Sequence, residues 1–148
     1  MDRICNNEGL VILSALYLLD NGVKELSRLD LLLVLSVDIA IRKRIVNYNN
    51  YQEFLNREGK YDCILNRKFK EFQLIILNAL TLMKLSGMIE HGEGTELELS
   101  AEGKNMVEDA TGMHEKSAIE VKNASFVLNS IAKSIDTIKL YNDLKIVL

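Results

Sequence analysis

Proline is absent from this chain of 148 residues, although average usage would give about seven. A proline inside a helix removes a backbone hydrogen bond and clashes with the preceding turn. Its absence therefore favours long, uninterrupted helices.

Cysteine and histidine are scarce, with two of each: Cys5, Cys63, His91 and His114. Their spacing matches no zinc finger or zinc ribbon, so we expect no metal site and ordinary reduced thiols. The sequence leaves one alternative open, a catalytic Cys/His pair that only folding brings together.

The sequence also lacks long apolar runs. The longest, residues 29–41, is interrupted by Asp30, Ser36 and Asp38 and is shorter than the roughly 20 residues of a membrane span. The first ten residues show no signal-peptide pattern. We therefore expect a soluble, cytoplasmic protein.

Catalytic motifs are missing as well. The glycine-containing stretch 92–105 fails the phosphate-loop pattern, because its glycine spacing differs and Asn105 stands where that pattern needs Ser or Thr. The glutamates of residues 90–98 largely alternate with apolar residues, as on the solvent face of a hairpin. We expect no enzymatic activity, no catalytic residues and no cofactor.

What the chain has in quantity is apolar side chains, at 48% of residues, enough to bury one core. We therefore expect a single domain over residues 1–148. An apolar segment, 8–20, predicts a central helix, and residues from about 29 to 46 predict a second, capped by Ser27 and broken near Ser36. Residues 47–66 predict a loop, a short helix over 51–57 and a second loop.

Residues 67–104 organise the rest of the chain. Apolar side chains recur every three to four positions from Phe69 to Met83, which predicts a long helix with one buried face. Gly87 ends this helix, because glycine adopts positive φ at little cost. Ser100 is a suitable cap for the next helix.

Two short strands are predicted between these helices, over 88–91 and 95–99. They flank Gly92-Glu93-Gly94, and the two glycines supply the positive φ that hairpin turns need. Helix, two-stranded wing and helix form the second half of a winged helix-turn-helix.

A basic band lies between Arg42 and Lys70, with eight basic and three acidic residues, against a net charge of −3 for the whole chain. A solvated surface is the common explanation of such a band, and phosphate contact is the alternative. The candidate DNA-binding residues are Arg42, Lys43, Arg44, Arg67, Lys68 and Lys70.

The C-terminal part predicts a helix over 116–133 with an apolar stripe made by Ile119, Phe126, Val127, Ile131 and Ile135. The following segment is apolar to its end, and apolar termini are usually tied down against something. It either completes the core or docks onto a partner. The candidate docking residues are Leu140, Tyr141, Leu144, Ile146, Val147 and Leu148.

Residues 67–148 resemble the middle component of three-component ABC systems, the small subunit encoded beside an SMC-like ATPase, as in Lamassu-type antiphage defence. The resemblance rests on an aromatic pair, an Asn-Ala-Leu, a Gly-x-Ile-Glu at the wing, and a Leu-x-Leu-Ser followed by Glu-Gly-Lys. These lie at Phe69 and Phe72, 78–80, 87–90, 97–100 and 102–104. Where this chain has Gln73 and Leu74, family members often carry a proline.

The resemblance implies a mainly α fold: a winged helix-turn-helix with a small β-hairpin wing and an added C-terminal helical segment. Its parts would be N-terminal helices (8–46), helix, wing and helix (67–108), and the segment 114–148. It also implies a non-catalytic accessory subunit that links an SMC-like ATPase to an effector nuclease, with double-stranded DNA as a further contact and no membrane partner.

A stand-alone winged-helix transcription regulator is the alternative. However, from Phe72 to Gly87 only five side chains are polar, few for reading base edges, and the wing glutamates would repel phosphates. Protein binding by the winged part fits better, with DNA contact confined to the basic band. Neighbouring genes for a coiled-coil ATPase and a nuclease would decide between the two.

Overall fold

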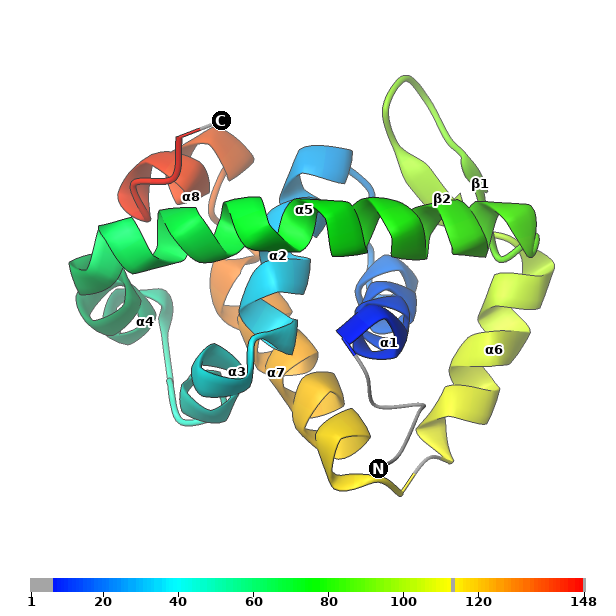
Figure 1. Ribbon diagram of the computed structural model, residues 1–148, viewed down its shortest axis with the longest axis horizontal. Helices are drawn as coiled ribbons and strands as arrows, with labels where there is room; N and C mark the ends of the chain where they lie inside the picture. Colours follow the sequence, from blue (N-terminus) through cyan, green and yellow to red (C-terminus); the bar gives the residue numbers. More distant parts are fainter. Residues whose placement is uncertain (1–6, 113, 148) are drawn as a thin grey trace.

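The computed structural model describes residues 7–112 and 114–147, and it is mainly helical with one two-stranded antiparallel sheet (Figure 1). The helices of the described part are α1 (Asn7–Asp20), α2 (Leu26–Val37), α3 (Ile39–Ile45), α4 (Tyr51–Glu58), the 3-10 turn η2 (Gly59–Tyr61), α5 (Asp62–Leu85), α6 (Ala101–Thr111), α7 (Lys116–Ala132) and α8 (Thr137–Asp143). The strands are β1 (Ile89–His91) and β2 (Leu97–Leu99). None of the helices described is long and apolar enough to cross a membrane.

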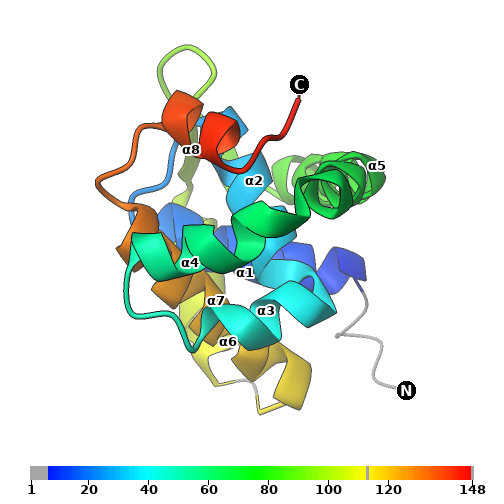
Figure 2. The same ribbon diagram turned by 90° about the vertical axis from the view of Figure 1, so that its left-hand side faces the viewer.

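Helices α1 and α2 form the middle of the core, with α5 packed on one side and α7 on the other (Figures 1 and 2). Nearly every residue from Leu10 to Leu19 is buried, as expected of a helix that is apolar on most faces. The prediction of a central helix over 8–20 is therefore confirmed.

The predicted helix over 29–46 is two helices, α2 and α3, which meet at Asp38. The backbone of Asp38 leaves the helical region at φ −56° and ψ 125°, and its carboxylate accepts a hydrogen bond from the Ile41 N–H at 3.0 Å. Asp38 thus caps α3, two residues beyond the break predicted at Ser36. The predicted Ser27 cap is wrong, because α2 already begins at Leu26.

The second loop predicted before residue 67 is also wrong. Chain order runs from α4 through η2 directly into α5, which begins at Asp62 and continues for 24 residues. The short helix predicted over 51–57 is confirmed as α4. Helix α5 consequently spans the whole front of the molecule in Figure 1.

The helix, strands and helix after residue 67 follow the prediction, except that of the two turn glycines Gly94 has a positive φ, of 60°, and Gly92 does not. Gly87 has φ +76° after the end of α5, and β1 pairs with β2 so that Ile89 faces Leu99. The Ser100 hydroxyl accepts a hydrogen bond from the Gly103 N–H at 3.1 Å, which caps α6. A Cβ at Gly103 would lie 2.1 Å from the Met88 carbonyl oxygen, so only glycine permits this close approach of α6 to β1.

The apolar stripe predicted over the region of α7 is confirmed in part: Val127, Ile131 and Ile135 pack partly buried against the core, but the other two members are exposed. Ile119 and Phe126 are each 43% exposed, and the buried face consists of Val121 and Leu128 with smaller residues between them. These smaller residues are Ala118, Ala124, Ser125 and Ala132. They let α7 approach α1 closely enough for Ser14 and Ser125 to form a hydrogen bond of 2.8 Å.

Candidate functional site

The six predicted DNA-binding residues divide into two groups. Arg42, Arg44 and Lys68 have acidic partners in other parts of the fold, whereas Arg67 pairs only with the exposed Glu71 one turn along α5, at 3.8 Å. Arg42 is only 4% exposed; its Nε lies 3.1 Å from Glu120 Oε1 and its Nη1 donates to the Val37 carbonyl at 2.8 Å. A buried guanidinium that ties α3 to α7 cannot reach a phosphate. For Arg42 the prediction of DNA contact is therefore corrected to a structural role.

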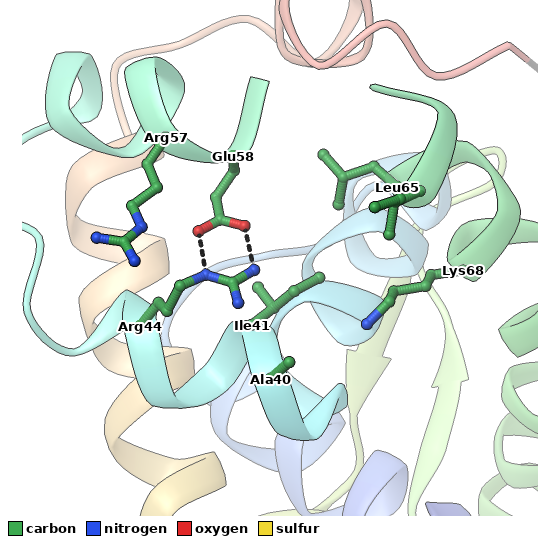
Figure 3. A pocket seen from close by; sticks show the side chains of 8 residues that line it. Ala40, Ile41, Arg44, Arg57, Glu58, Leu65 and Lys68 are labelled. Atoms are coloured by element: carbon green, nitrogen blue, oxygen red, sulfur yellow. Dashed lines mark hydrogen bonds and ion pairs between the residues drawn. The ribbon is translucent and has the colours of Figure 1, made fainter. Parts of the chain in front are cut away.

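Arg44 belongs to the same internal group and lines a hollow between α3, α4 and the start of α5 (Figure 3). The hollow has a volume of about 330 Å³. Its lining combines apolar and charged side chains: Ala40, Ile41, Arg44, Arg57, Glu58, Ile64, Leu65 and Lys68. Two of the candidate residues of the basic band, Arg44 from before α4 and Lys68 from after it, line this hollow.

Two hydrogen bonds join Arg44 to Glu58 at one wall of the hollow. Arg44 Nε donates to Oε2 at 2.9 Å and Nη2 donates to Oε1 at 2.8 Å, while the Tyr48 hydroxyl also bonds to Oε2. The hydrogen bond to Glu58 is the main cause that raises the pKa of Arg44, and burial followed by the same carboxylate raises the pKa of Tyr48. These contacts hold the end of α4 against α3.

Lys68 completes the internal group from the α5 side. Its ammonium lies 2.9 Å from both carboxylate oxygens of Asp38, the residue that caps α3. Since Arg44 and Lys68 each have a carboxylate partner, Arg57 is the one lining cation for which no ion pair is found among the described residues. The hollow can attract an anion weakly, and it offers no nucleophile with an adjacent base.

The remaining predicted DNA-binding residues, Lys43, Arg67 and Lys70, are exposed, so they are accessible to phosphates. Arg57 and Lys60 are exposed too and line a second open hollow of about 680 Å³ together with Arg44 and Tyr48. They belong to the predicted basic band but were not among its candidate contacts. The accessible part of the band thus differs from the predicted set.

The predicted docking residues of the C-terminal segment are mostly buried within the domain. Leu140 and Leu144 are fully buried, Tyr141 packs edge-on against Phe69 at 5.6 Å between ring centroids, and Ile146 is 6% exposed. Only Val147 is exposed among those described, and Leu148 lies outside the described residues. For these four buried side chains the docking expectation is corrected, and the alternative that the segment completes the core holds.

The outward face of α5 carries exposed leucines that the sequence reasoning did not single out. Leu74, Leu77 and Leu85 are 66%, 62% and 81% exposed, and Leu82, on the flank of the same helix, is 45% exposed. Their spacing in the sequence could have indicated this exposure, because it puts them on the side of the helix that faces away from the buried Phe69, Ile76 and Met83. Exposed apolar side chains clustered on one helix face mark an interaction surface more often than chance.

The hairpin of β1 and β2 presents carboxylates to solvent. Glu90 and Glu98 stand opposite each other across the two strands, both exposed, and His91 is exposed beside them. Over residues 7–112 and 114–147, no group of three or more His, Cys, Asp or Glu side chains is placed to hold a metal ion.

Comparison with protein-family models gives no match, and neither a curated protein nor a solved structure matches this chain.

Proposed function

We propose that this chain is a winged-helix, non-catalytic accessory subunit of a bacterial SMC-like ABC ATPase complex in antiphage defence, where it links the ATPase to an effector nuclease. The identity of the complex comes from the resemblance of residues 67–148 to the middle component of three-component ABC systems. The observation that carries the protein-binding role is the exposed leucine face of α5.

A winged-helix reading is supported by the way the segment before α2 joins the hairpin. Glu25 forms a β-bridge with Glu96, and the Leu97 N–H donates to the Lys24 carbonyl at 2.9 Å. β2 therefore lies between this segment and β1, which is the strand order of a winged helix. In that comparison α5 takes the place of the recognition helix.

The side chains on α5 favour a protein partner over base edges. Recognition helices present groups such as Arg, Asn and Gln to the major groove. Here the exposed residues of α5 include Leu74, Leu77 and Leu85, and in this described stretch only Asn78 and Lys84 are free polar groups between them, since the hydroxyl of Thr81 is already bonded to the Leu77 carbonyl at 2.7 Å. Leucines of this exposure gain free energy when a protein surface covers them.

The wing supports the same conclusion through its charge. Glu90, Glu93 and Glu98 are exposed where DNA-binding wings touch the phosphate backbone, so they oppose such a contact. A second contact with DNA, within the assembled complex, would use the exposed residues of the basic band. A stand-alone transcription regulator is the second candidate, and those exposed cations are what favours it.

The test is recovery of partners with the tagged chain from its native cells, identified by mass spectrometry. We expect a long coiled-coil ATPase and a nuclease to be recovered, and we expect both to be lost when Leu74 and Leu77 are replaced by Glu. Ile119→Glu is the matched control, because Ile119 is exposed to 43% on α7, on the far side of the core. Recovery of DNA of one operator sequence with the tagged chain, and of no ATPase, would favour the stand-alone transcription regulator.

A further inference from the structure

Two hollows adjoin at the same pair of arginines. The hollow drawn in Figure 3 and the open hollow of about 680 Å³ both have Arg44 and Arg57 in their linings. Their other walls differ in chemistry. The first hollow adds mainly apolar side chains, which are Ala40, Ile41, Ile64 and Leu65, and the second adds polar ones, which are Asn47, Tyr48, Glu53, Asn56 and Lys60.

Two cations of this combined lining have no internal partner. The lining holds four cationic and two acidic side chains. Arg44 and Lys68 are held by the carboxylates described above, whereas Arg57 and Lys60 make no ion pair within the described ranges. Glu53, one turn before Arg57 on α4, instead accepts a hydrogen bond from the N–H of residue 49 at 3.0 Å.

We propose that the two hollows form one binding site for a small phosphate monoester with a planar, apolar group, of the class of a nucleoside monophosphate. Its phosphate lies on the polar side, against Arg57 and Lys60, and its base lies on the apolar side, over Ala40 and Ile64. The inference goes beyond the proposed function, and none of the exposed leucines of α5 lines either hollow.

The two free cations indicate the charge of the ligand. A phosphate monoester carries about −1.5 to −2 at pH 7, whereas an ionised carboxylate carries a single charge. Two cations without internal partners therefore match a phosphate monoester better than a carboxylate. The guanidinium of Arg57 can also donate two parallel hydrogen bonds to phosphate oxygens, and Lys60 adds a compact positive charge.

The apolar wall indicates the body of the ligand. Ile64 is 41% exposed and Ala40 is exposed as well, so these two side chains offer apolar surface that a ligand can cover. In Figure 3, Arg57 stands to one side of Arg44, while Ala40 and Ile41 lie to the other. The Arg44 side chain between them is 33% exposed, and guanidinium planes stack on aromatic rings. A planar group that extends across Arg44 thus joins the charged side to the apolar side.

The size and shape of the hollows suit a small molecule. Their volumes, about 330 and 680 Å³, lie within the range of roughly 300 to 1,000 Å³ that is typical of small-ligand sites. The amides of Asn47 and Asn56 can donate to and accept from sugar hydroxyls. A DNA duplex keeps its bases inside the stack, so it would leave the apolar wall uncovered.

NMR titration of the ¹⁵N-labelled full chain tests the site, with AMP, GMP, CMP and UMP as ligands and inorganic phosphate as the reference. We expect saturable binding of at least one nucleotide, with a dissociation constant on the order of 100 µM, and binding of inorganic phosphate that is at least roughly tenfold weaker. Because the chain is titrated alone, the result does not depend on the ATPase or the nuclease.

Arg57→Gln tests the charged side of the site. It should weaken binding of the nucleotide at least roughly fivefold, because the phosphate loses a charge-assisted hydrogen-bond donor. Lys104→Gln is the matched control, since it removes an exposed cation from α6, at the other end of the molecule in Figure 1, and it should leave the affinity unchanged. Circular dichroism of each variant checks that it folds.

Ile64→Ser tests the apolar side separately. It should weaken the nucleotide at least roughly fivefold and leave the affinity for inorganic phosphate unchanged, because phosphate alone does not cover the apolar wall. Ile119→Ser, at a site on α7 that is 43% exposed, is the matched control and should change neither affinity.

Three results overturn the proposal. The first is the absence of saturable binding for all four nucleotides, and the second is an equal loss in Arg57→Gln and Lys104→Gln. The third is tighter binding of a DNA duplex than of any nucleotide, weakened by Arg57→Gln, which would assign these cations to DNA contact. Saturable binding of a nucleotide that is weakened by both Arg57→Gln and Ile64→Ser, and by neither control, supports the site.

Discussion

The guanidinium of Arg44 and the carboxylate of Glu58 form two parallel hydrogen bonds, of 2.9 and 2.8 Å, across the junction of α3 and α4. Glu58 is 1% exposed, and Tyr48 supplies a further hydrogen bond to the same carboxylate. A residue predicted from charge alone to contact DNA is therefore occupied in holding two helices together.

Replacing Arg44 by Met should lower the free energy of unfolding by about 2–3 kcal/mol, because the buried Glu58 carboxylate loses its cation while keeping Tyr48. Urea denaturation measures the change. Arg57→Met is the matched control, since Arg57 is exposed on the neighbouring helix, and we expect a change within about 0.5 kcal/mol. Equal losses in the two variants would contradict the structural role of Arg44.

The C-terminal segment gives a second prediction on stability. Leu140 and Leu144 are fully buried, so Leu140→Ala and Leu144→Ala should each cost about 2–4 kcal/mol of unfolding free energy. Val147→Ala, at a site that is 65% exposed, should cost little. We also expect deletion of residues 140–148 to destabilise the domain itself, which is contradicted if the truncated chain melts cooperatively at the native temperature.

Elements with strong local signals were predicted well from the sequence. Gly87 and the glycine-containing turn act through their own backbones, and the Ser100 hydroxyl caps the helix that follows it directly. The helix, strands and helix around them could therefore be located without tertiary information. The all-round apolarity of α1 likewise placed it in the core. The break at Asp38 was missed by two residues, although its cap is local, a hydrogen bond from the Ile41 N–H to the Asp38 carboxylate.

Features that depend on pairs of distant residues could not be predicted. The register of α7 follows from a close approach to α1 through Ala124 and Ser125, whereas the sequence pattern drew attention to larger side chains. In the same way, nothing in the basic run indicated that Arg42 would meet Glu120, 78 positions away. Local charge predicts a basic band, and only the fold decides which of its members face solvent.

Only the exposed members of the basic band can contact DNA. If the band contacts phosphates, replacing Lys43, Arg67 and Lys70 by Gln should weaken binding of the complex equally on unrelated sequences. The slope of log affinity against log salt should fall by up to about 0.9 per lost contact. Arg42→Gln should change stability instead. An unchanged salt slope in the triple variant would assign the exposed band to solvent or to a protein partner.

Asp30 on α2 makes stability depend on pH, because burial raises its pKa to about 6. An unfolded chain gives an aspartate a pKa of about 3.9, so the folded state binds the proton more tightly. The stabilisation from the protonated carboxyl is fully present below about pH 4 and is lost as pH rises through 6. Two pKa units correspond to at most about 3 kcal/mol, and partial exposure of Asp30 reduces this.

Asp30→Asn should therefore raise the free energy of unfolding by about 1–2 kcal/mol at pH 8 and leave it nearly unchanged at pH 4. Urea denaturation at both pH values measures the difference. Asp20→Asn is the matched control, since Asp20 is exposed at the end of α1, and it should show no such rise. A gain for Asp30→Asn of the same size at pH 4 would show that packing of the amide, and not loss of the buried charge, is the cause.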